Sequence, residues 1–282
     1  MKRKVEKQVT GYRTEDGAGV SLVRVLGNGT TSEFDPILML DSFDSTDPKA
    51  YTAGFPMHPH RGIETISYVY QGGMIHKDSL GSEDAIADGE LQWMTAGSGI
   101  LHEEKIPAAP RLLGVQLWLN LPAVNKMTSP EYHSIKNEEI SEFLFDGGLL
   151  RLLAGEYQGN KGYQSKYLPL DYYDIHLEPE SEITIQTDPS RSVMVFTLRG
   201  DAVIDDAVVL EKTAAKLTAG KSVTIRSTEK AAQVLFISSL ALKEPVAWSG
   251  PIVMNTNDEI RQAFADLEQG TFLREATRYH KA

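Results

Sequence analysis

The chain of 282 residues contains no cysteine. This absence excludes disulfide bonds, thiolate zinc sites and a cysteine nucleophile, so any metal ion must be bound by nitrogen and oxygen atoms. No run approaches the roughly 20 apolar residues that cross a bilayer, and no apolar segment follows the basic start MKRKVEK. We therefore expect a soluble, cytoplasmic protein that does not bind membranes.

Basic residues are fewer than acidic ones. The chain has 28 Lys and Arg residues against 39 Asp and Glu residues, which gives a formal net charge of −11. The field of such a molecule repels polyanions and disfavours direct binding to nucleic acid. The length is about twice the commonest single-domain size, so it predicts two domains, each large enough to form its own hydrophobic core.

Short runs rich in Val, Ile, Leu, Tyr and Thr recur along the chain between Gly, Asp, Asn and Pro residues. Short strands joined by tight turns leave no room for the crossover helices of a parallel sheet, so this spacing predicts antiparallel sheets and an all-β fold. The two halves share the same turn pattern, which predicts a duplicated β-barrel. The expected strands span residues 20–26, 63–70, 114–121, 149–153, 172–177, 183–187, 193–198, 223–225 and 233–238.

Two segments carry helical patterns. Near the end of the chain, Thr256 and Glu259 form a capping box and Gly270 supplies a C-cap, which predicts a helix between them. A shorter pattern over residues 137–145 predicts a second helix at the boundary between the two halves. The apolar stripe of the first helix, which should pack against the protein, consists of Ile260, Ala263, Phe264 and Leu267.

The motif MHPHRG places two of the seven histidines on either side of a proline. Because successive side chains of an extended segment point to opposite faces, His58 and His60 share a face, about 6.6 Å apart along the backbone. His102 and Glu104 have the same spacing in LHEE, whereas Glu103 points away. Two such pairs predict a metal site of three histidines and one carboxylate. The alternative is that the first pair are loop histidines and the third is a core histidine.

The donor set limits the metal. Imidazoles with one carboxylate oxygen suit Fe(II), and also Mn, Co, Ni, Cu or Zn, among which affinity alone does not select. Four protein ligands in an octahedral sphere leave positions for water, O2 or substrate, which is typical of an active site. A closed site that only ties strands together is the structural alternative.

Six segments together resemble the pirin family of the cupin superfamily. They are FDPILMLDSF, HPHRGIETISYVYQGG, HKDSLG, LQWMTAGSGILHEE, GVQLWLNLP and GPIVMNTNDEI, and the match runs nearly end to end. The resemblance implies two tandem cupin barrels, each a double-stranded β-helix. The first, residues 1–135, would bind the metal and be completed by residues 240–282, with the C-terminal helix packing back on it. The second, residues 136–239, would lack metal ligands.

The resemblance also assigns residues. It implies one divalent metal ion, usually iron, held by His58, His60, His102 and Glu104. Glu64 stands where many cupins place a further ligand and is the reserve candidate. His76, with Asp78 in HKDSLG, either contacts a substrate at the cavity mouth or stabilises its loop.

Two functions follow from the resemblance. Some pirin-like proteins resemble quercetinases, which implies a quercetin 2,3-dioxygenase-type enzyme that opens a flavonol ring with O2 and releases CO. Glu104 would then act as the catalytic base on the flavonol hydroxyl. The alternative is a non-enzymatic, redox-sensitive iron protein that regulates transcription or metabolism through protein partners, in the nucleus if the source is eukaryotic. We expect a monomer in either case.

Overall fold

The computed structural model describes residues 1–274 and divides the chain into two compact units. The unit named here the N-terminal barrel comprises Arg13–Arg24, Ile37–Lys136 and the described residues from Lys243 onward. The unit named the C-terminal barrel comprises Met1–Tyr12, Val25–Pro36 and Asn137–Leu242. Apart from one α-helix and short 3-10 turns, the regular structure is β-strand, so the predicted all-β class is confirmed.

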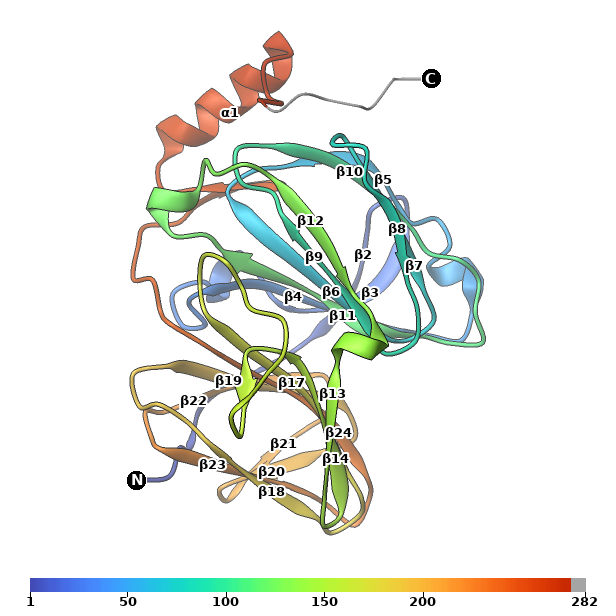
Figure 1. The fold of residues 1–282 in the computed structure, drawn as a ribbon, viewed down its shortest axis with the longest axis vertical. Coiled ribbons are helices and arrows are strands. Elements are labelled where there is room, and N and C mark those ends of the chain that lie inside the picture. Colours follow the sequence, from blue (N-terminus) through green and yellow to red (C-terminus); the bar gives the residue numbers. More distant parts are fainter. Residues whose placement is uncertain (275–282) are drawn as a thin grey trace. The chain divides into compact units, whose positions relative to one another are not determined.

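The N-terminal barrel is built from a seven-stranded and a four-stranded antiparallel sheet, a two-stranded ribbon and one helix. Its elements are β2 (Tyr12–Asp16), β3 (Val20–Leu26), β4 (Ile37–Ser45), η2 (Pro48–Ala50), β5 (Phe55–His60), β6 (Ile63–Gln71), β7 (Met74–Asp78), β8 (Glu83–Ile86), β9 (Glu90–Thr95), β10 (Ile100–Lys105), β11 (Leu112–Asn120), η3 (Ala123–Asn125), β12 (Glu131–Ile135), β25 (Ala247–Ser249), β26 (Ile252–Met254) and α1 (Asn257–Gln269). The sheet orders are β12-β9-β6-β11-β4-β3-β2 and β5-β10-β7-β8, with β25 paired to β26 (Figure 1).

The C-terminal barrel repeats this plan. Its elements are β1 (Val5–Thr10), η1 (Asn28–Thr30), η4 (Asn137–Glu139), β13 (Ser141–Phe145), β14 (Gly148–Ala154), β15 (Glu156–Tyr157), β16 (Asn160–Lys161), β17 (Leu170–Leu177), β18 (Glu182–Gln186), β19 (Ser192–Arg199), β20 (Ala202–Ile204), β21 (Ala207–Val209), β22 (Thr213–Leu217), β23 (Ser222–Ser227) and β24 (Ala232–Ser239). The sheet orders are β1-β22-β19-β24-β17-β14-β13 and β18-β23-β20-β21, with β15 paired to β16.

The unit boundaries differ from the sequence-based division at the start of the chain. Residues 1–12 and 25–36 group with the C-terminal barrel rather than with residues 37–136. The reason is that β1 pairs antiparallel with β22, with Val9 opposite Ala214. Strand pairing over a separation of about 200 residues leaves no local signal in the sequence, so composition and turns do not reveal it.

The two barrel interiors have different chemistry. The C-terminal barrel encloses a large apolar cluster that includes Leu152, Ile175 and Phe236. The N-terminal barrel has apolar clusters as well, but it also buries polar side chains among them, including Gln92 and Gln116. A buried polar group is costly unless it is hydrogen-bonded, so these residues mark the part of the molecule where function is to be sought.

The predicted helix over residues 137–145 is wrong. Only Asn137–Glu139 form a short 3-10 turn, and Ser141–Phe145 form β13, which pairs with β14. The side chains alternate along β13: Phe143 and Phe145 pack against the apolar cluster, whereas Leu144 is exposed. A period of two is typical of a strand with one buried face. Pairing with β14 therefore selects a strand over the helix that the local sequence also favours.

The predicted C-terminal helix is confirmed as α1. Thr256 Oγ1 accepts a hydrogen bond from the Glu259 amide at 3.2 Å, and the Thr256 amide donates to Glu259 Oε2 at 2.8 Å. Gly270 ends the helix in the left-handed conformation with φ of 71°. The helix contacts β25 and β26 and packs on the N-terminal barrel.

The predicted apolar stripe of α1 is only partly right. Ile260 and Ala263 are buried, but Phe264 is 38% exposed, and Asp266 is buried instead. Asp266 Oδ2 accepts a hydrogen bond at 2.6 Å from Nη1 of the buried Arg61. An ion pair therefore sets the rotation of the helix, which hydrophobic periodicity could not indicate.

Arg61 is the centre of this contact. Its Nε donates to the Ser98 carbonyl at 2.7 Å, its Nη2 donates to the Phe272 carbonyl at 2.9 Å, and its guanidinium lies 4.2 Å from the centre of the Phe272 ring. A buried guanidinium with most donors satisfied holds the C-terminal segment against the residue that follows His60.

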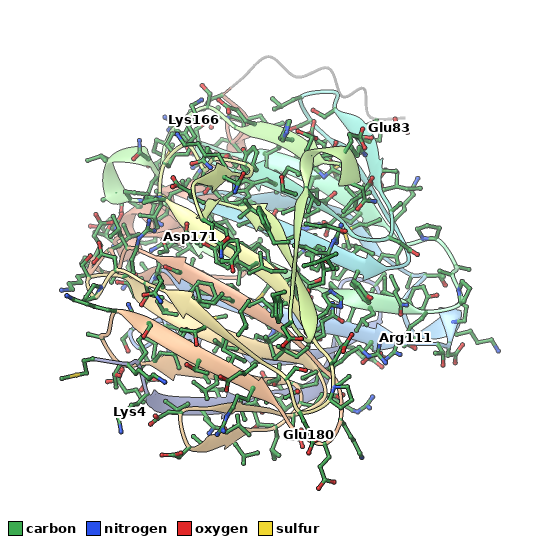
Figure 2. All side chains as sticks on the ribbon, turned by 60° about the horizontal axis from the view of Figure 1, so that its bottom comes forward. Lys4, Glu83, Arg111, Lys166, Asp171 and Glu180 are labelled. Atoms are coloured by element: carbon green, nitrogen blue, oxygen red, sulfur yellow. The ribbon has the colours of Figure 1, made fainter. Side chains whose placement is uncertain are left out.

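Acidic side chains are exposed on the surface of both units. Figure 2 shows Glu83 and Glu180 projecting away from the ribbon. Among the described residues, no helix combines the length and the apolar character needed to cross a bilayer.

Two substitutions in α1 test its observed rotation. Ile260→Ala should lower the free energy of unfolding by roughly 2–4 kcal/mol because it leaves a cavity, whereas Phe264→Ala should cost less than about 1 kcal/mol. Urea denaturation followed by circular dichroism measures both values. Equal losses would show that Phe264 is part of the packed face after all.

Candidate metal centre

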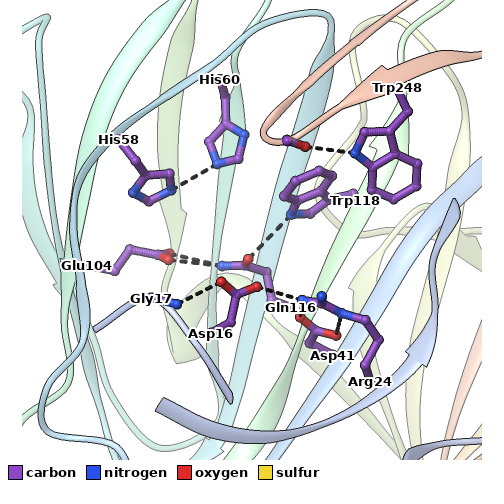
Figure 3. A network of polar contacts seen from close by, with 11 residues as sticks. Asp16, Gly17, Arg24, Asp41, His58, His60, Glu104, Gln116, Trp118 and Trp248 are labelled. Carbon is purple, nitrogen blue, oxygen red and sulfur yellow. Dashed lines mark hydrogen bonds and ion pairs between the residues drawn. The ribbon is translucent and has the colours of Figure 1, made fainter. Parts of the chain in front are cut away.

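Three histidines gather on β5 and β10 of the four-stranded sheet. In the observed register His102 lies opposite His58, and His60 lies opposite Ile100. The metal-binding nitrogens of the three histidines all lie within 4.8 Å of one another, and this is the group of possible ligands found among the described residues. Figure 3 shows the adjacent His58 and His60 rings. The structure thus brings together three of the four predicted ligands.

Hydrogen bonds determine which nitrogen of each ring carries the proton. Nδ1 of His58 lies 2.8 Å from the Pro56 carbonyl oxygen, and Nδ1 of His60 lies 2.9 Å from the Pro251 carbonyl oxygen. A carbonyl only accepts, so both Nδ1 atoms are protonated and both Nε2 atoms carry lone pairs. Those two Nε2 atoms lie only 3.1 Å apart. Two facing lone pairs repel unless a cation binds both.

His102 completes the donor set. Its Nε2 is buried and has no hydrogen-bond partner in the structure. A buried polar atom without a partner costs about 1–3 kcal/mol. Three converging imidazole nitrogens of this kind fit a divalent transition-metal ion, and all three come from residues predicted as ligands.

Burial keeps the imidazoles of His60 and His102 neutral. Burial, followed by repulsion from His58, lowers the pKa of His60 to about 3. Burial also lowers the pKa of His102 well below its usual range, with repulsion from the neighbouring histidines adding to it. Neutral imidazole is the form that binds metals, so these rings need not lose a proton at neutral pH.

Glu104 lies on the same face of β10 as His102. It is 2% exposed, whereas Glu103 faces away and lies 3.7 Å from Lys105. The choice of Glu104 over Glu103 therefore agrees with the alternation of the strand. The Glu104 carboxylate is nevertheless outside the three-histidine group. The β5–β10 register shifts between His102 and Glu104, and Glu104 pairs with Phe55.

Two glutamines hold the Glu104 carboxylate. Gln92 Nε2 donates to Oε1 at 2.6 Å, and Gln116 Nε2 donates to Oε2 at 3.0 Å. Each amide is oriented from its other end, because Tyr132 Oη donates to Gln92 Oε1 at 3.3 Å and Trp118 Nε1 donates to Gln116 Oε1 at 3.4 Å. Figure 3 shows Gln116 between Glu104 and Trp118. The sequence-based prediction did not include the two glutamines. A polar residue at an inward-facing position of an otherwise apolar strand was the pattern that could have indicated them.

Glu64, the reserve ligand, lies elsewhere. Ile63 belongs to the apolar cluster around Trp118, so the adjacent Glu64 faces the opposite side of β6. Its Oε1 accepts a hydrogen bond from Thr95 Oγ1 at 2.7 Å. Glu64 does not join the histidine group.

Aromatic side chains line one side of the centre. The Trp118 ring meets the His60 ring edge to face with centroids 5.0 Å apart, and Trp248 lies 5.5 Å from Trp118 (Figure 3). Trp248 comes from β25, far along the chain. The C-terminal segment lies close to the backbone of Gly62: a Cβ at this position would lie 2.0 Å from the Val253 carbonyl oxygen. Glycine is required at this position, where φ is 81°.

Two antiparallel barrels of like strand order, with a histidine cluster in one of them, define the chain as a two-barrel cupin. Residues 19–119 match the family model described as Pirin, and residues 172–273 match the Pirin C-terminal cupin domain. The chain belongs to the pirin family, which confirms the resemblance found in the sequence.

Known relatives match nearly the whole chain. A pirin-like protein of Caulobacter vibrioides is 37% identical over 275 residues, which are 96% of this chain and 99% of that protein. Pirin of Homo sapiens is 37% identical over 270 residues, covering 94% and 92%. A crystal structure described as quercetin 2,3-dioxygenase from Acinetobacter baumannii is 32% identical, with a TM-score of 0.88 and coverage of 96% and 99%.

The environment of Glu64 predicts a pH dependence of stability. Burial raises the pKa of Glu64 from 4.5 to about 7, against the smaller opposing effect of the Thr95 hydroxyl. The folded state therefore retains a proton that the unfolded state releases. Protonated Glu64 thus contributes to the free energy of unfolding an amount that is fully present below pH 4.5 and is lost as the pH rises through 7.

Glu64→Gln removes this titration. The difference in unfolding free energy between wild type and variant should shift by on the order of 3 kcal/mol between pH 5 and pH 8, in favour of the variant at high pH. Urea denaturation at several pH values measures it, with the exposed Glu83→Gln as control. A pH-independent difference would contradict the prediction.

Proposed function

We propose that the protein is a metal-dependent dioxygenase of the quercetin 2,3-dioxygenase type, which opens a flavonol ring with O2 and releases CO. The observation that carries the proposal is the convergence of three histidine nitrogens within 4.8 Å of one another, on the sheet that also carries the buried Glu104. The similarity to the Acinetobacter baumannii structure described as quercetin 2,3-dioxygenase supports a flavonol as the substrate class.

The metal would be held by His58, His60 and His102, with Glu104 as the proposed fourth ligand. A divalent ion, for which we propose Fe(II), would supply Lewis acidity toward the flavonol oxygens and O2. Mn, Co, Ni, Cu and Zn suit the same nitrogen and oxygen donors.

The protein's own residues would prepare the substrate. Glu104 would take the proton of the flavonol hydroxyl, a role that requires its carboxylate to be held in a fixed orientation. Gln92 and Gln116 provide that orientation through their hydrogen bonds to Oε1 and Oε2. Trp118 and Trp248 supply apolar surface that excludes water and contacts an aromatic ligand.

A metal-binding experiment tests the ligand assignment. The full chain should bind one divalent ion, and His102→Ala should lower its affinity by at least tenfold because one of the converging nitrogens is lost. Isothermal titration calorimetry measures the affinity. His176→Ala, which removes a histidine of the C-terminal barrel, should leave it unchanged. Equal affinity in wild type and His102→Ala would refute the assignment.

An activity experiment tests the reaction. Protein loaded anaerobically with Fe(II) should, on addition of flavonol and air, consume O2 and release CO in equal amounts. Glu104→Gln should lower kcat by roughly 100-fold to 10,000-fold, since it removes the base. Gas analysis and flavonol absorbance follow the reaction. Metal-loaded wild type without turnover across a panel of flavonols would reject the dioxygenase and leave the regulatory alternative.

A further inference from the structure

His76 and Asp78 form a buried pair on β7, next to the strand that carries His102. Both side chains are 0% exposed, and His76 Nε2 lies 2.9 Å from Asp78 Oδ2. In the β7–β10 register Asp78 is opposite His102 and His76 is opposite Glu104. The pair is therefore buried beside the candidate metal centre and is not exposed at the surface.

The loop after β7 requires only half of the Asp78 carboxylate. Oδ1 accepts hydrogen bonds from the backbone amides of Leu80 at 2.9 Å and Ser82 at 3.0 Å. These two bonds satisfy the turn that HKDSLG forms. Oδ2 is left for His76, so stabilisation of the loop does not account for the buried imidazole.

The hydrogen bonds form a directed chain toward the metal centre. The Asp78 oxygen accepts, so His76 Nε2 donates, and in a neutral ring His76 Nδ1 then carries the lone pair. His76 Nδ1 lies 3.4 Å from His102 Nδ1, which must therefore be the donor. With its proton on Nδ1, His102 presents an unprotonated Nε2, the atom without a hydrogen-bond partner.

We propose that His76 and Asp78 are positioning residues that set the tautomer of His102, so that its Nε2 is available to a metal ion. This inference rests on the proposed metal site. The pair does for His102 what the Pro56 and Pro251 carbonyl oxygens do for the other two histidines. Partners of this kind orient ligands and typically change metal affinity 10-fold to 100-fold.

Tyr132 on β12 holds the pair in place. Its ring stacks on the His76 ring with centroids 4.0 Å apart and an interplanar angle of 9°. Its hydroxyl also donates to Gln92, which donates to Glu104. One tyrosine thus supports both the histidine side and the carboxylate side of the centre.

The C-terminal barrel contains a second Asp–His pair, in the reverse order and with its histidine side chain 26% exposed. Asp174 and His176 have the same spacing, with His176 Nε2 lying 2.8 Å from Asp174 Oδ2. His176 lies opposite Leu149 and Gln233 in the sheet register, not opposite a histidine of the cluster. Substitution at Asp174 therefore changes a similar pair without changing the tautomer of His102.

The decisive variant is Asp78→Asn in the full chain. The two backbone amides keep the introduced carbonyl oxygen at the Oδ1 position, so the introduced NH2 group faces His76 Nε2. His76 then moves its proton to Nδ1, and His102 in turn moves its own proton from Nδ1 to Nε2. Each ring stays neutral, since a proton only changes nitrogen within it. The metal-binding atom of His102 becomes protonated.

Two measurements read out this change. Nitrogen-15 NMR of metal-free protein with labelled histidine should show His102 protonated on Nε2 in Asp78→Asn and on Nδ1 in wild type. Zinc affinity, measured by competition with a chromogenic chelator, should fall 10-fold to 100-fold. Asp174→Asn should change neither value. An unchanged His102 tautomer with zinc affinity within twofold of wild type would overturn the proposal, as would an equal loss in Asp174→Asn.

A second comparison covers the case in which Asp78→Asn does not fold. His76→Gln retains both an acceptor for His102 and a donor for Asp78, so it should bind zinc more tightly than His76→Leu by at least fivefold. Equal zinc affinity of these two variants would overturn the positioning role. Wild type that binds no zinc would instead refute the metal site, so the two failures are distinguishable. Flavonol turnover enters neither result.

Discussion

Three imidazole nitrogens that converge within 4.8 Å of one another are the constraint on which the candidate metal centre depends. The Nε2 atoms of His58 and His60 lie 3.1 Å apart. A proton on either of them would replace the repulsion between their lone pairs by a hydrogen bond. The fold removes that option, because the carbonyl oxygens beside the two rings retain the protons on Nδ1. The surrounding structure thus maintains an arrangement that is unfavourable alone and favourable with a bound cation, as expected of a preorganised site.

The C-terminal segment contributes directly to this centre. The Pro251 carbonyl binds His60 across 191 positions of sequence, and Trp248 extends the aromatic wall begun by Trp118. The Arg61–Asp266 ion pair anchors α1 to the residue after His60. Each contact joins the last strands and helix to the region of β5, which carries two of the histidines. The geometry of the centre therefore requires two segments that are distant in sequence to meet.

The two barrels show how one architecture is used in two ways. Both have a seven-stranded and a four-stranded sheet, and both contain an Asp–His pair with spacing of two residues. In the C-terminal barrel apolar side chains fill the interior. In the N-terminal barrel glutamines and histidines replace part of that packing, and further partners contact Gln92, Gln116, His58, His60 and His102. Fold and function are therefore separable, and the function depends on which side chains face inward.

The sequence by itself determined the features that depend on near neighbours: the all-β class, the capped helix α1, and the shared face of His58 and His60. Strand alternation and capping act over two to four residues, so they can be read locally. Tertiary structure alone decided that residues 141–145 form a strand, that Asp266 rather than Phe264 turns inward, and that Gln92 and Gln116 bind the Glu104 carboxylate. Those outcomes depend on a paired strand, a distant arginine and two glutamines from other strands, which are contacts between segments that no local pattern encodes.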